Sequence, residues 1–157
     1  MRKALVTTAL VLLALPLPAS AMDQSVKPDA LKWGAAPPAF PPGAQFAVIA
    51  GDPGKEGPFV LRLKVPASYK VAPHTHPGDE NVTVISGSFN IGMGDKLDTS
   101  KGEKVPVGGF MRVEKGMQHY AWFTEPTVIQ VHGIGPSAIN YVNPADDPRK
   151  STKAQGN

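Results

Sequence analysis

The segment 74–80, HTHPGDE, contains the residues whose types and spacing are best suited to chemistry. Alternate side chains of an extended strand point to the same face, so the rings of His74 and His76 are predicted to lie side by side. The Pro-Gly pair that follows favours a turn, and Glu80 then begins the next strand with its carboxylate able to reach the two rings. Two imidazoles and a carboxylate form a good site for a first-row divalent cation.

A fourth ligand is available at His119, on the later predicted strand 118–123. The chain has no cysteine, so a metal site must use nitrogen and oxygen ligands. Such ligands accept manganese, iron, nickel, copper or zinc, and ligand type does not decide among these metals. The alternative is a protein that carries the motif but holds no metal.

The elements that must position these residues are predicted to be short strands. The chain has 16 glycines and 17 prolines, which disfavour long helices and favour tight turns between strands. No segment has a convincing helical period. Strands are predicted over residues 46–50, 59–65, 81–86, 88–93, 105–107, 110–113, 118–123, 127–132 and 139–142. This pattern predicts an all-β sandwich or barrel in a single domain.

The candidate ligands resemble the two sequence motifs of the cupin superfamily. The first motif runs H-x-H, three or four residues, E, six residues and G, and the chain has His74, His76, Glu80 and Gly87 at that spacing. The second motif ends in G-x-x-H, and the segment 116–119 ends in His119 in the same way. The flanking segments APPAFPPGAQ and QVHGIGP also resemble small exported bacterial cupins related to the ChrR-like cupin domain.

Three turn or packing positions depart from the family pattern. Ser68 stands where a glycine is expected before the first histidine, Glu114 where a proline is expected, and Phe123 where an asparagine is expected. These departures concern the shape of loops and leave the ligand set complete.

The resemblance implies a double-stranded β-helix, a jelly-roll barrel of two antiparallel sheets, over residues 46–143. In this family the positions of His74, His76, Glu80 and His119 hold one divalent metal ion inside the barrel. The proline-rich segment 22–45 is expected to form an extended N-terminal arm, because proline fixes its own backbone and restricts the preceding residue. Residues 144–157 are polar and are expected to form a disordered C-terminal tail.

His132, the remaining histidine, lies on the predicted strand 127–132, and two orientations of this strand are open. In one orientation Gln130 and His132 line the barrel interior, and His132 is then a second candidate catalytic residue beside Glu80, as a proton acceptor. In the other, Ile129 and Val131 face inward and His132 lies outside. The strand alternation alone does not choose between them.

The first 21 residues are predicted to be a cleavable signal peptide. Arg2 and Lys3 precede an apolar run, 4–15, and the small-x-small sequence Ala-Ser-Ala ends at Ala21, the predicted cleavage site. A membrane anchor is the alternative, but a spanning helix needs about 20 apolar residues and this run is shorter. We therefore expect a periplasmic or secreted protein with no membrane attachment after cleavage. The remaining charge is nearly balanced and contains no basic run, so nucleic acid is not an expected partner.

The resemblance implies a metal-dependent enzyme of dioxygenase, decarboxylase, lyase or isomerase type that acts on a small organic molecule in the barrel. The alternative is a non-catalytic cupin that binds or senses a metal and a small ligand. A third interpretation is a homodimeric scaffold with a closed zinc site. The sequence contains no feature that decides among these functions or identifies the substrate.

Overall fold

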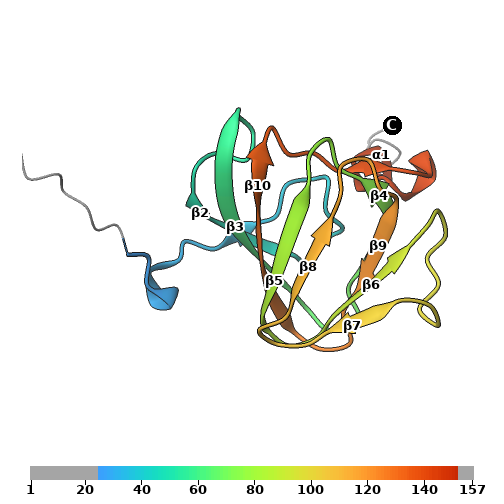
Figure 1. Cartoon of the computed structure of the whole chain (residues 1–157), viewed down its shortest axis with the longest axis horizontal. Coiled ribbons are helices and arrows are strands. Elements are labelled where there is room, and N and C mark those ends of the chain that lie inside the picture. Colours follow the sequence, from blue (N-terminus) through green and yellow to red (C-terminus); the bar gives the residue numbers. More distant parts are fainter. Residues whose placement is uncertain (1–24, 152–157) are drawn as a thin grey trace, which may run out of the picture.

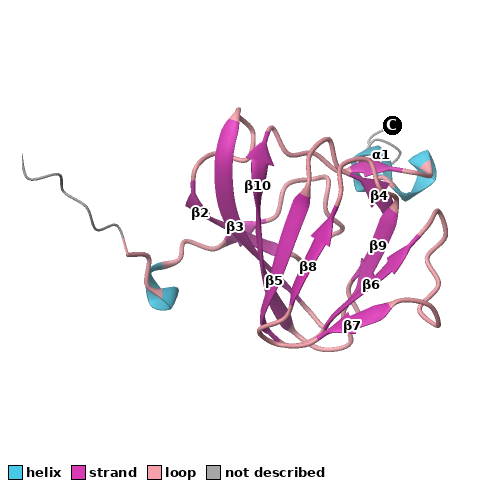
Figure 2. Ribbon diagram, viewed as in Figure 1, coloured by secondary structure: helices cyan, strands magenta, loops and turns pink. Residues whose placement is uncertain are grey.

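The computed structural model describes residues 25–151, which form two facing antiparallel sheets (Figures 1 and 2). The six-stranded sheet has the order β1-β2-β3-β10-β5-β8, and the five-stranded sheet has the order β11-β4-β9-β6-β7. The first sheet consists of β1 (Gly34–Ala35), β2 (Gln45–Ala50), β3 (Gly57–Val65), β10 (Thr127–Gly135), β5 (Glu80–Ser86) and β8 (Phe110–Val113). The second consists of β11 (Asn140–Tyr141), β4 (Lys70–Thr75), β9 (His119–Trp122), β6 (Phe89–Met93) and β7 (Glu103–Val105). The predicted all-β architecture of two antiparallel sheets is confirmed.

The hydrophobic core lies between the two sheets and follows from alternation along the strands. Phe59, Leu61 and Leu63 of β3 are buried while the residues between them are partly exposed, as expected for a strand with one face inward. Residues from the facing sheet, such as Phe89 and Ile91 of β6, complete the same core. At the centre of the first sheet, β3 pairs with β10 over the full length of both strands.

Two turns show why the sequence motifs carry particular residues. Gly87, between β5 and β6, has φ of 81°, and a Cβ atom there would collide with Thr127. A glycine is therefore required both by the left-handed backbone and by the close approach of the neighbouring strand. Ser68 also adopts a left-handed backbone, with φ of 63°. The turn before β4 thus keeps the conformation that a glycine would favour, and the serine departs from the family pattern in side chain only.

The N-terminal arm packs against the barrel. Its strand β1 pairs with β2, and two tyrosine hydroxyls hold the segment that follows. The Tyr69 hydroxyl donates a hydrogen bond of 2.6 Å to the carbonyl oxygen of Pro41. The Tyr141 hydroxyl donates one of 2.8 Å to the carbonyl oxygen of Ala39. These two bonds join the arm to the five-stranded sheet, since Tyr69 directly precedes β4 and Tyr141 lies on β11, whereas β1 joins the arm to the six-stranded sheet.

Residues 144–151 were predicted to be disordered, but the structure shows them ordered in two short helices. The structure places a 3-10 helix at Pro144–Asp146, capped by the Asn143 side chain, and a short helix α1 at Pro148–Ser151. The guanidinium of Arg149 donates to the carbonyl oxygen of Ile139, which ties the segment back to the barrel. One further 3-10 helix, Pro28–Ala30, lies in the arm.

Two predicted segments, the signal peptide 1–21 and the end of the tail, 152–157, lie outside the described residues. The domain boundaries therefore stay predictions. Within residues 25–151, the helices are too short and too polar for any of them to cross a membrane.

A buried polar cluster, named here the Ser88 cluster (Ser88, Asn90 and Thr127), lies where β5 passes into β6 and β10 begins. The Ser88 amide donates to the Thr127 hydroxyl at 2.9 Å. That hydroxyl in turn lies 2.9 Å from the carbonyl oxygen of Glu125, which accepts from it. The Asn90 amide nitrogen donates to the Ser88 hydroxyl and to the carbonyl oxygen of Trp122. Each buried side chain of this cluster therefore has a hydrogen-bond partner. The cluster connects β6 to the start of β10 and so stabilises this end of the barrel.

Candidate metal centre

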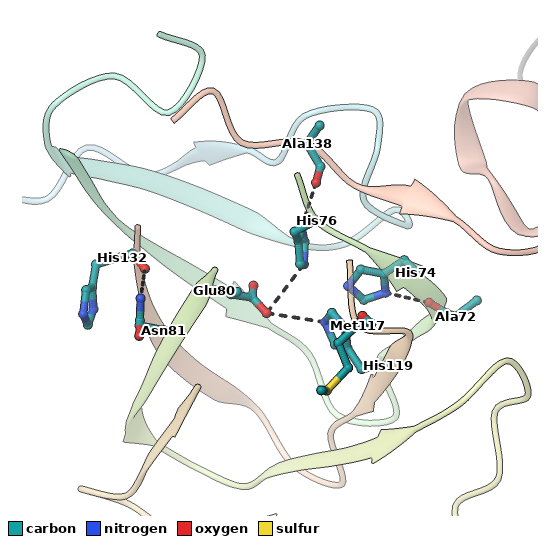
Figure 3. Close-up of polar contacts among 9 residues, drawn as sticks. All are labelled: Ala72, His74, His76, Glu80, Asn81, Met117, His119, His132 and Ala138. Atoms are coloured by element: carbon teal, nitrogen blue, oxygen red, sulfur yellow. Dashed lines mark hydrogen bonds and ion pairs between the residues drawn. The ribbon is translucent and has the colours of Figure 1, made fainter. Parts of the chain in front are cut away.

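Strand pairing brings the predicted ligands together at the opposite end of the barrel (Figure 3). His74 lies near the end of β4 and His119 begins β9, and the two residues are direct partners in the antiparallel register. His76 follows the end of β4. Glu80 begins β5, in the other sheet, and directs its carboxylate toward the rings. Four residues from three strands and one turn thus converge, as the sequence predicted; we name them the histidine cluster (His74, His76, His119 and Glu80).

The distances within the histidine cluster suit a shared metal ion. One ring nitrogen from each of His74, His76 and His119 lies within 4.8 Å of the others. A Glu80 carboxylate oxygen lies 3.5 Å from Nε2 of His76 and 3.5 Å from Nε2 of His119. Nitrogen and oxygen ligands bind a divalent ion such as zinc at about 2.0–2.2 Å, so ligands on opposite sides of one ion are about 4 Å apart. A small contraction would bring all four residues onto one ion.

Backbone carbonyl groups fix the tautomer of each ring. Nδ1 of His74 lies 2.8 Å from the carbonyl oxygen of Ala72, and Nδ1 of His76 lies 2.7 Å from that of Ala138. Nδ1 of His119 has the same contact with residue 117, at 3.0 Å. A carbonyl oxygen can only accept, so each Nδ1 must carry the proton and each neutral ring presents an Nε2 lone pair. Bonds of this kind orient metal-binding histidines and fix their tautomer.

The inward-facing nitrogens have no hydrogen-bond partner of their own. Nε2 of His76 and Nε2 of His119 are both inaccessible to solvent and unpartnered, and His74 and His119 are only 4% and 2% exposed. Buried polar atoms are normally satisfied, because desolvating them without a partner is unfavourable. Two unpartnered lone pairs beside a carboxylate are the arrangement that a divalent metal satisfies. The residues present therefore fit a metal ion.

The electrostatics of the cluster keep His74 neutral and Glu80 ionised, whereas His76 is drawn toward its protonated form. Burial, together with the rings of His119 and His76, lowers the pKa of His74 to about 3, so this ring stays neutral. Burial opposes a charge on His76, but the Glu80 carboxylate outweighs it and raises the His76 pKa. Burial also opposes a charge on Glu80, yet His76 and His119 hold its pKa well below the usual range. Glu80 is thus anionic, and a metal ion would compete with a proton for Nε2 of His76.

The cluster forms one polar wall of a cavity of about 260 Å³ between the sheets. The other walls are apolar and come from both sheets, the arm and the loops that precede β3 and β11. Pro37, Ala39 and Phe40 of the arm line the cavity, which adds this part of the arm to the site. Periodicity did not identify this contribution, because an extended proline-rich arm has no pattern that shows where it packs.

His132 does not lie in this cavity, which corrects its assignment as a candidate catalytic residue. Ile129 and Val131 of β10 line the cavity, so alternation turns Gln130 and His132 to the outer face of the sheet. There the Gln130 side chain accepts a hydrogen bond from a β3 arginine. The His132 ring lies 6.3 Å from the ring of Phe110, centroid to centroid, and points away from the histidine cluster (Figure 3). Of the two orientations left open by the sequence, the structure has the second.

Other aromatic and sulfur side chains near the motifs also lie outside the cavity. Tyr120 is buried beneath the loop after β6, and its hydroxyl donates to the carbonyl oxygen of Asp98. Met93 and Met117 are both about half exposed, at 50% and 42%. Met111 does pack against the core.

The sequence resembles one protein family over most of its length. The family described as "ChrR Cupin-like domain" matches residues 21–138. The chain belongs to this cupin family. No curated protein sequence matches the cupin significantly.

Solved structures confirm the jelly-roll fold of the cupin. The polyketide cyclase RemF from Streptomyces resistomycificus is 17% identical with a TM-score of 0.67, covering 84% of this chain and 94% of that one. A putative acetylacetone dioxygenase from Methylibium petroleiphilum is 18% identical with a TM-score of 0.62, covering 90% and 100%. The anti-sigma factor ChrR of Rhodobacter sphaeroides, in complex with SigE, is 15% identical with a TM-score of 0.51; 68% of this chain is covered, but only 50% of that one. At these identities the likeness extends to the fold alone.

Proposed function

We propose that this cupin is a metal-dependent enzyme that acts on a small organic molecule in the cavity. The observation that carries the proposal is the convergence of three tautomer-fixed Nε2 lone pairs and one carboxylate on the wall of an otherwise apolar cavity. His74, His76 and His119 would hold the metal, with Glu80 as the fourth ligand. A divalent ion bound there would polarise a substrate oxygen.

Glu80 is the residue of the cluster that can also move a proton. Its carboxylate lies 3.5 Å from both His76 and His119 and faces the cavity, so it can accept a proton from a substrate bound beside the rings. The reaction classes consistent with this arrangement are dioxygenase, decarboxylase, lyase and isomerase chemistry. Oxygen uptake with a β-diketone is the first assay we would choose, because a structural neighbour is described as a putative acetylacetone dioxygenase.

Metal content followed by turnover tests this proposal. The cupin, without residues 1–21, is purified without chelators or a histidine tag, and its metal is quantified by mass spectrometry. Manganese, iron, nickel, copper and cobalt forms are then assayed for oxygen uptake and for loss of candidate substrates. A stoichiometric metal with turnover that Glu80→Gln abolishes supports the proposal. A folded protein that binds none of these metals contradicts it.

A second candidate function is a binding or sensing module that captures a ligand without transforming it. Among the described residues that line the cavity, Glu80 is the only ionisable side chain besides the three histidines. If Glu80 binds the metal, no further acid–base group stays available, which favours this candidate. A ligand that raises the melting temperature of the metal-loaded protein and is recovered unchanged would distinguish it from the enzyme.

We also propose that the cupin works in the periplasm or outside the cell. The support is the basic start, the apolar run and the Ala-Ser-Ala sequence that ends at Ala21. Fractionation of cells that express the full chain tests this. A mature protein beginning at Met22 in the periplasmic fraction is the expected result, and an uncleaved cytoplasmic protein would contradict it.

A further inference from the structure

The walls of the cavity are almost entirely apolar, whereas its proposed metal-binding end is polar. Of the side chains within residues 25–151 that line it, only those of His74, His76, His119, Glu80 and Ser137 are polar. The remaining walls are aliphatic and aromatic, and include the four phenylalanines Phe40, Phe46, Phe89 and Phe123. All polar recognition is therefore concentrated in one cluster and a single hydroxyl.

The cavity lining also lacks positively charged lysine and arginine side chains among the described residues. A phosphate group, or a carboxylate distant from the metal, would have no cation to pair with there, and burying an unpaired charge is strongly unfavourable. A sugar would bury several hydroxyl groups against apolar walls, again without partners. The cavity therefore disfavours ligands that carry charged or hydroxyl groups away from the metal-binding end.

The size of the cavity sets a further limit. Its volume of about 260 Å³ lies just below the usual range for ligand pockets, about 300–1,000 Å³. A ligand of this volume that reaches both the histidine cluster and the apolar walls must be compact. Its polar atoms must lie at one end.

We propose that the cavity takes a compact molecule with a chelating oxygen end and an uncharged, apolar body. The chelating end consists of adjacent oxo, hydroxyl or carboxylate oxygens, which a metal on the histidine cluster would bind, so this inference rests on the proposed function. The body packs among the phenylalanines. A 2-oxo acid with an aromatic side chain is one member of this class, and a 2-oxo acid with a second carboxylate is excluded from it.

Phe40 is the wall residue that we propose to set the fit of the body. It is the aromatic contribution of the arm to the cavity and packs against the core. The arm is fixed on either side of Phe40 by the tyrosine hydroxyls that bind the carbonyl oxygens of Ala39 and Pro41, at 2.8 and 2.6 Å. The backbone on both sides of Phe40 is thereby held by tyrosines at β4 and β11, neighbouring strands of the five-stranded sheet, which keeps the Phe40 ring at the cavity wall.

Two probes with the same chelating end test the inference. Phenylpyruvate and 2-oxoglutarate share a 2-oxo carboxylate and differ in the body, which is aromatic in one and charged in the other. The protein is loaded with Co²⁺, and each probe is titrated while the visible Co²⁺ spectrum and the heat of binding are recorded. We expect phenylpyruvate to shift the spectrum and to bind at least about tenfold more tightly than 2-oxoglutarate, because only its body fits an apolar pocket.

Variants at Phe40 assign the preference to the cavity wall. Phe40→Ala should weaken phenylpyruvate binding by about tenfold and leave the weak binding of 2-oxoglutarate unchanged. Phe110→Ala is the matched control, because this phenylalanine is 56% exposed on the outer face of the sheet. If Phe40→Ala does not fold, as judged by circular dichroism, Phe40→Leu removes the ring while keeping most of the bulk, and a smaller loss is expected.

The outcomes separate this inference from the proposed function. A protein that binds no Co²⁺ overturns both. A protein that binds Co²⁺ but prefers 2-oxoglutarate, or binds the two probes equally, overturns the ligand class and leaves the metal centre standing. Equal effects of the Phe40 and Phe110 variants on phenylpyruvate overturn the role of the arm.

Discussion

The two ends of the barrel each contain a buried polar cluster, and the clusters differ in the completeness of their hydrogen bonds. At one end, each buried side chain of the Ser88 cluster has a partner. At the other, the histidine cluster leaves Nε2 of His76 and of His119 without one. Completed hydrogen bonds stabilise the fold, whereas lone pairs held inward and unsatisfied have a use only when something binds them. The comparison separates a structural cluster from a candidate functional one within the same barrel.

The largest expected effect is the loss of metal from His76→Ala. This change removes one of the proposed ligands and the ring that pairs with Glu80. We expect metal affinity to fall by more than about 100-fold, the upper end of the loss seen when only an outer-shell partner is removed. Mass spectrometry of the purified variant, and titration with a competing chelator, measure the loss.

His132→Ala is the matched control for that experiment. It removes the same side chain from the outer face of the six-stranded sheet, away from the cavity, and should keep the metal content of the natural protein. Equal losses from the two variants would break the distinction between inner and outer histidines.

The next effect is a loss of stability of the metal-free protein in acid. Folding lowers the pKa of His74 from 6.5 to about 3. The unfolded chain therefore takes up a proton below pH 6.5 that the folded chain refuses until about pH 3, so the free energy of unfolding falls as pH falls through this interval. The lowered pKa of Glu80 acts in the same sense at lower pH, whereas the raised pKa of His76 acts in the opposite sense.

His74→Phe isolates the contribution of this ring. Urea unfolding of the metal-free natural protein and variant at several pH values between 7 and 4 compares their slopes, and the variant should have the flatter dependence. The Ser88 cluster has no ionisable side chain, so its contribution should not vary across this range. Parallel pH profiles for the natural protein and His74→Phe would contradict the assignment.

Thr127→Val tests the other end of the barrel. The substitution keeps the shape of the side chain but leaves the Ser88 amide buried without an acceptor. We expect the protein to lose about 1–3 kcal/mol of unfolding free energy, measured by urea unfolding, with no change in metal content. A variant that loses metal but not stability would reverse the roles that we assign to the two clusters.

The smallest expected effect is that of Tyr141→Phe, which removes one hydrogen bond from the arm. A loss of about 0.5–1.5 kcal/mol is expected. Burial and the charge of Asp147 raise the pKa of Tyr141 to about 12, from 10.0. The stabilisation from this hydroxyl is therefore complete below pH 10 and is lost as pH rises toward 12. Unfolding measured at pH 8 and pH 11 should show the gap between natural protein and variant narrowing; a constant gap would contradict it.

The sequence predicted the histidine cluster because its chemistry is local. His74, His76 and Glu80 lie within seven residues, and the spacing alone puts them near one another. His119 was a candidate from its residue type and predicted strand, and the resemblance to a known motif supported it. Its pairing with His74 depends on a register between strands distant in the chain, which spacing alone does not give. The acceptors of the Nδ1 protons could not be predicted, because they are main-chain carbonyls and leave no mark on residue type.

The position of His132 shows the limit of alternation as a guide. A strand with two comparable faces can turn either one inward, and the choice depends on the neighbours it pairs with. The pairing of β10 with β3 and β5 places Ile129 and Val131 beside inward-facing residues, which decides the question. The arm and the segment 144–151 were left open or misjudged for a related reason. Contacts such as the hydrogen bonds from Tyr69, Tyr141 and Arg149 hold them, and such contacts leave no periodic pattern in the sequence.

The three carbonyl groups that hold the imidazole rings have a consequence for how such a barrel can change over time. They belong to the main chain at Ala72, Met117 and Ala138, so replacing any of those three side chains leaves the acceptor where it is. The orientation of the ligands is therefore inherited with the fold and does not depend on which side chains surround them. Mutations in the apolar lining can therefore change the shape of the cavity while the three rings keep the orientation that the proposed metal site requires, so the proposed ligand preference can evolve separately from metal binding.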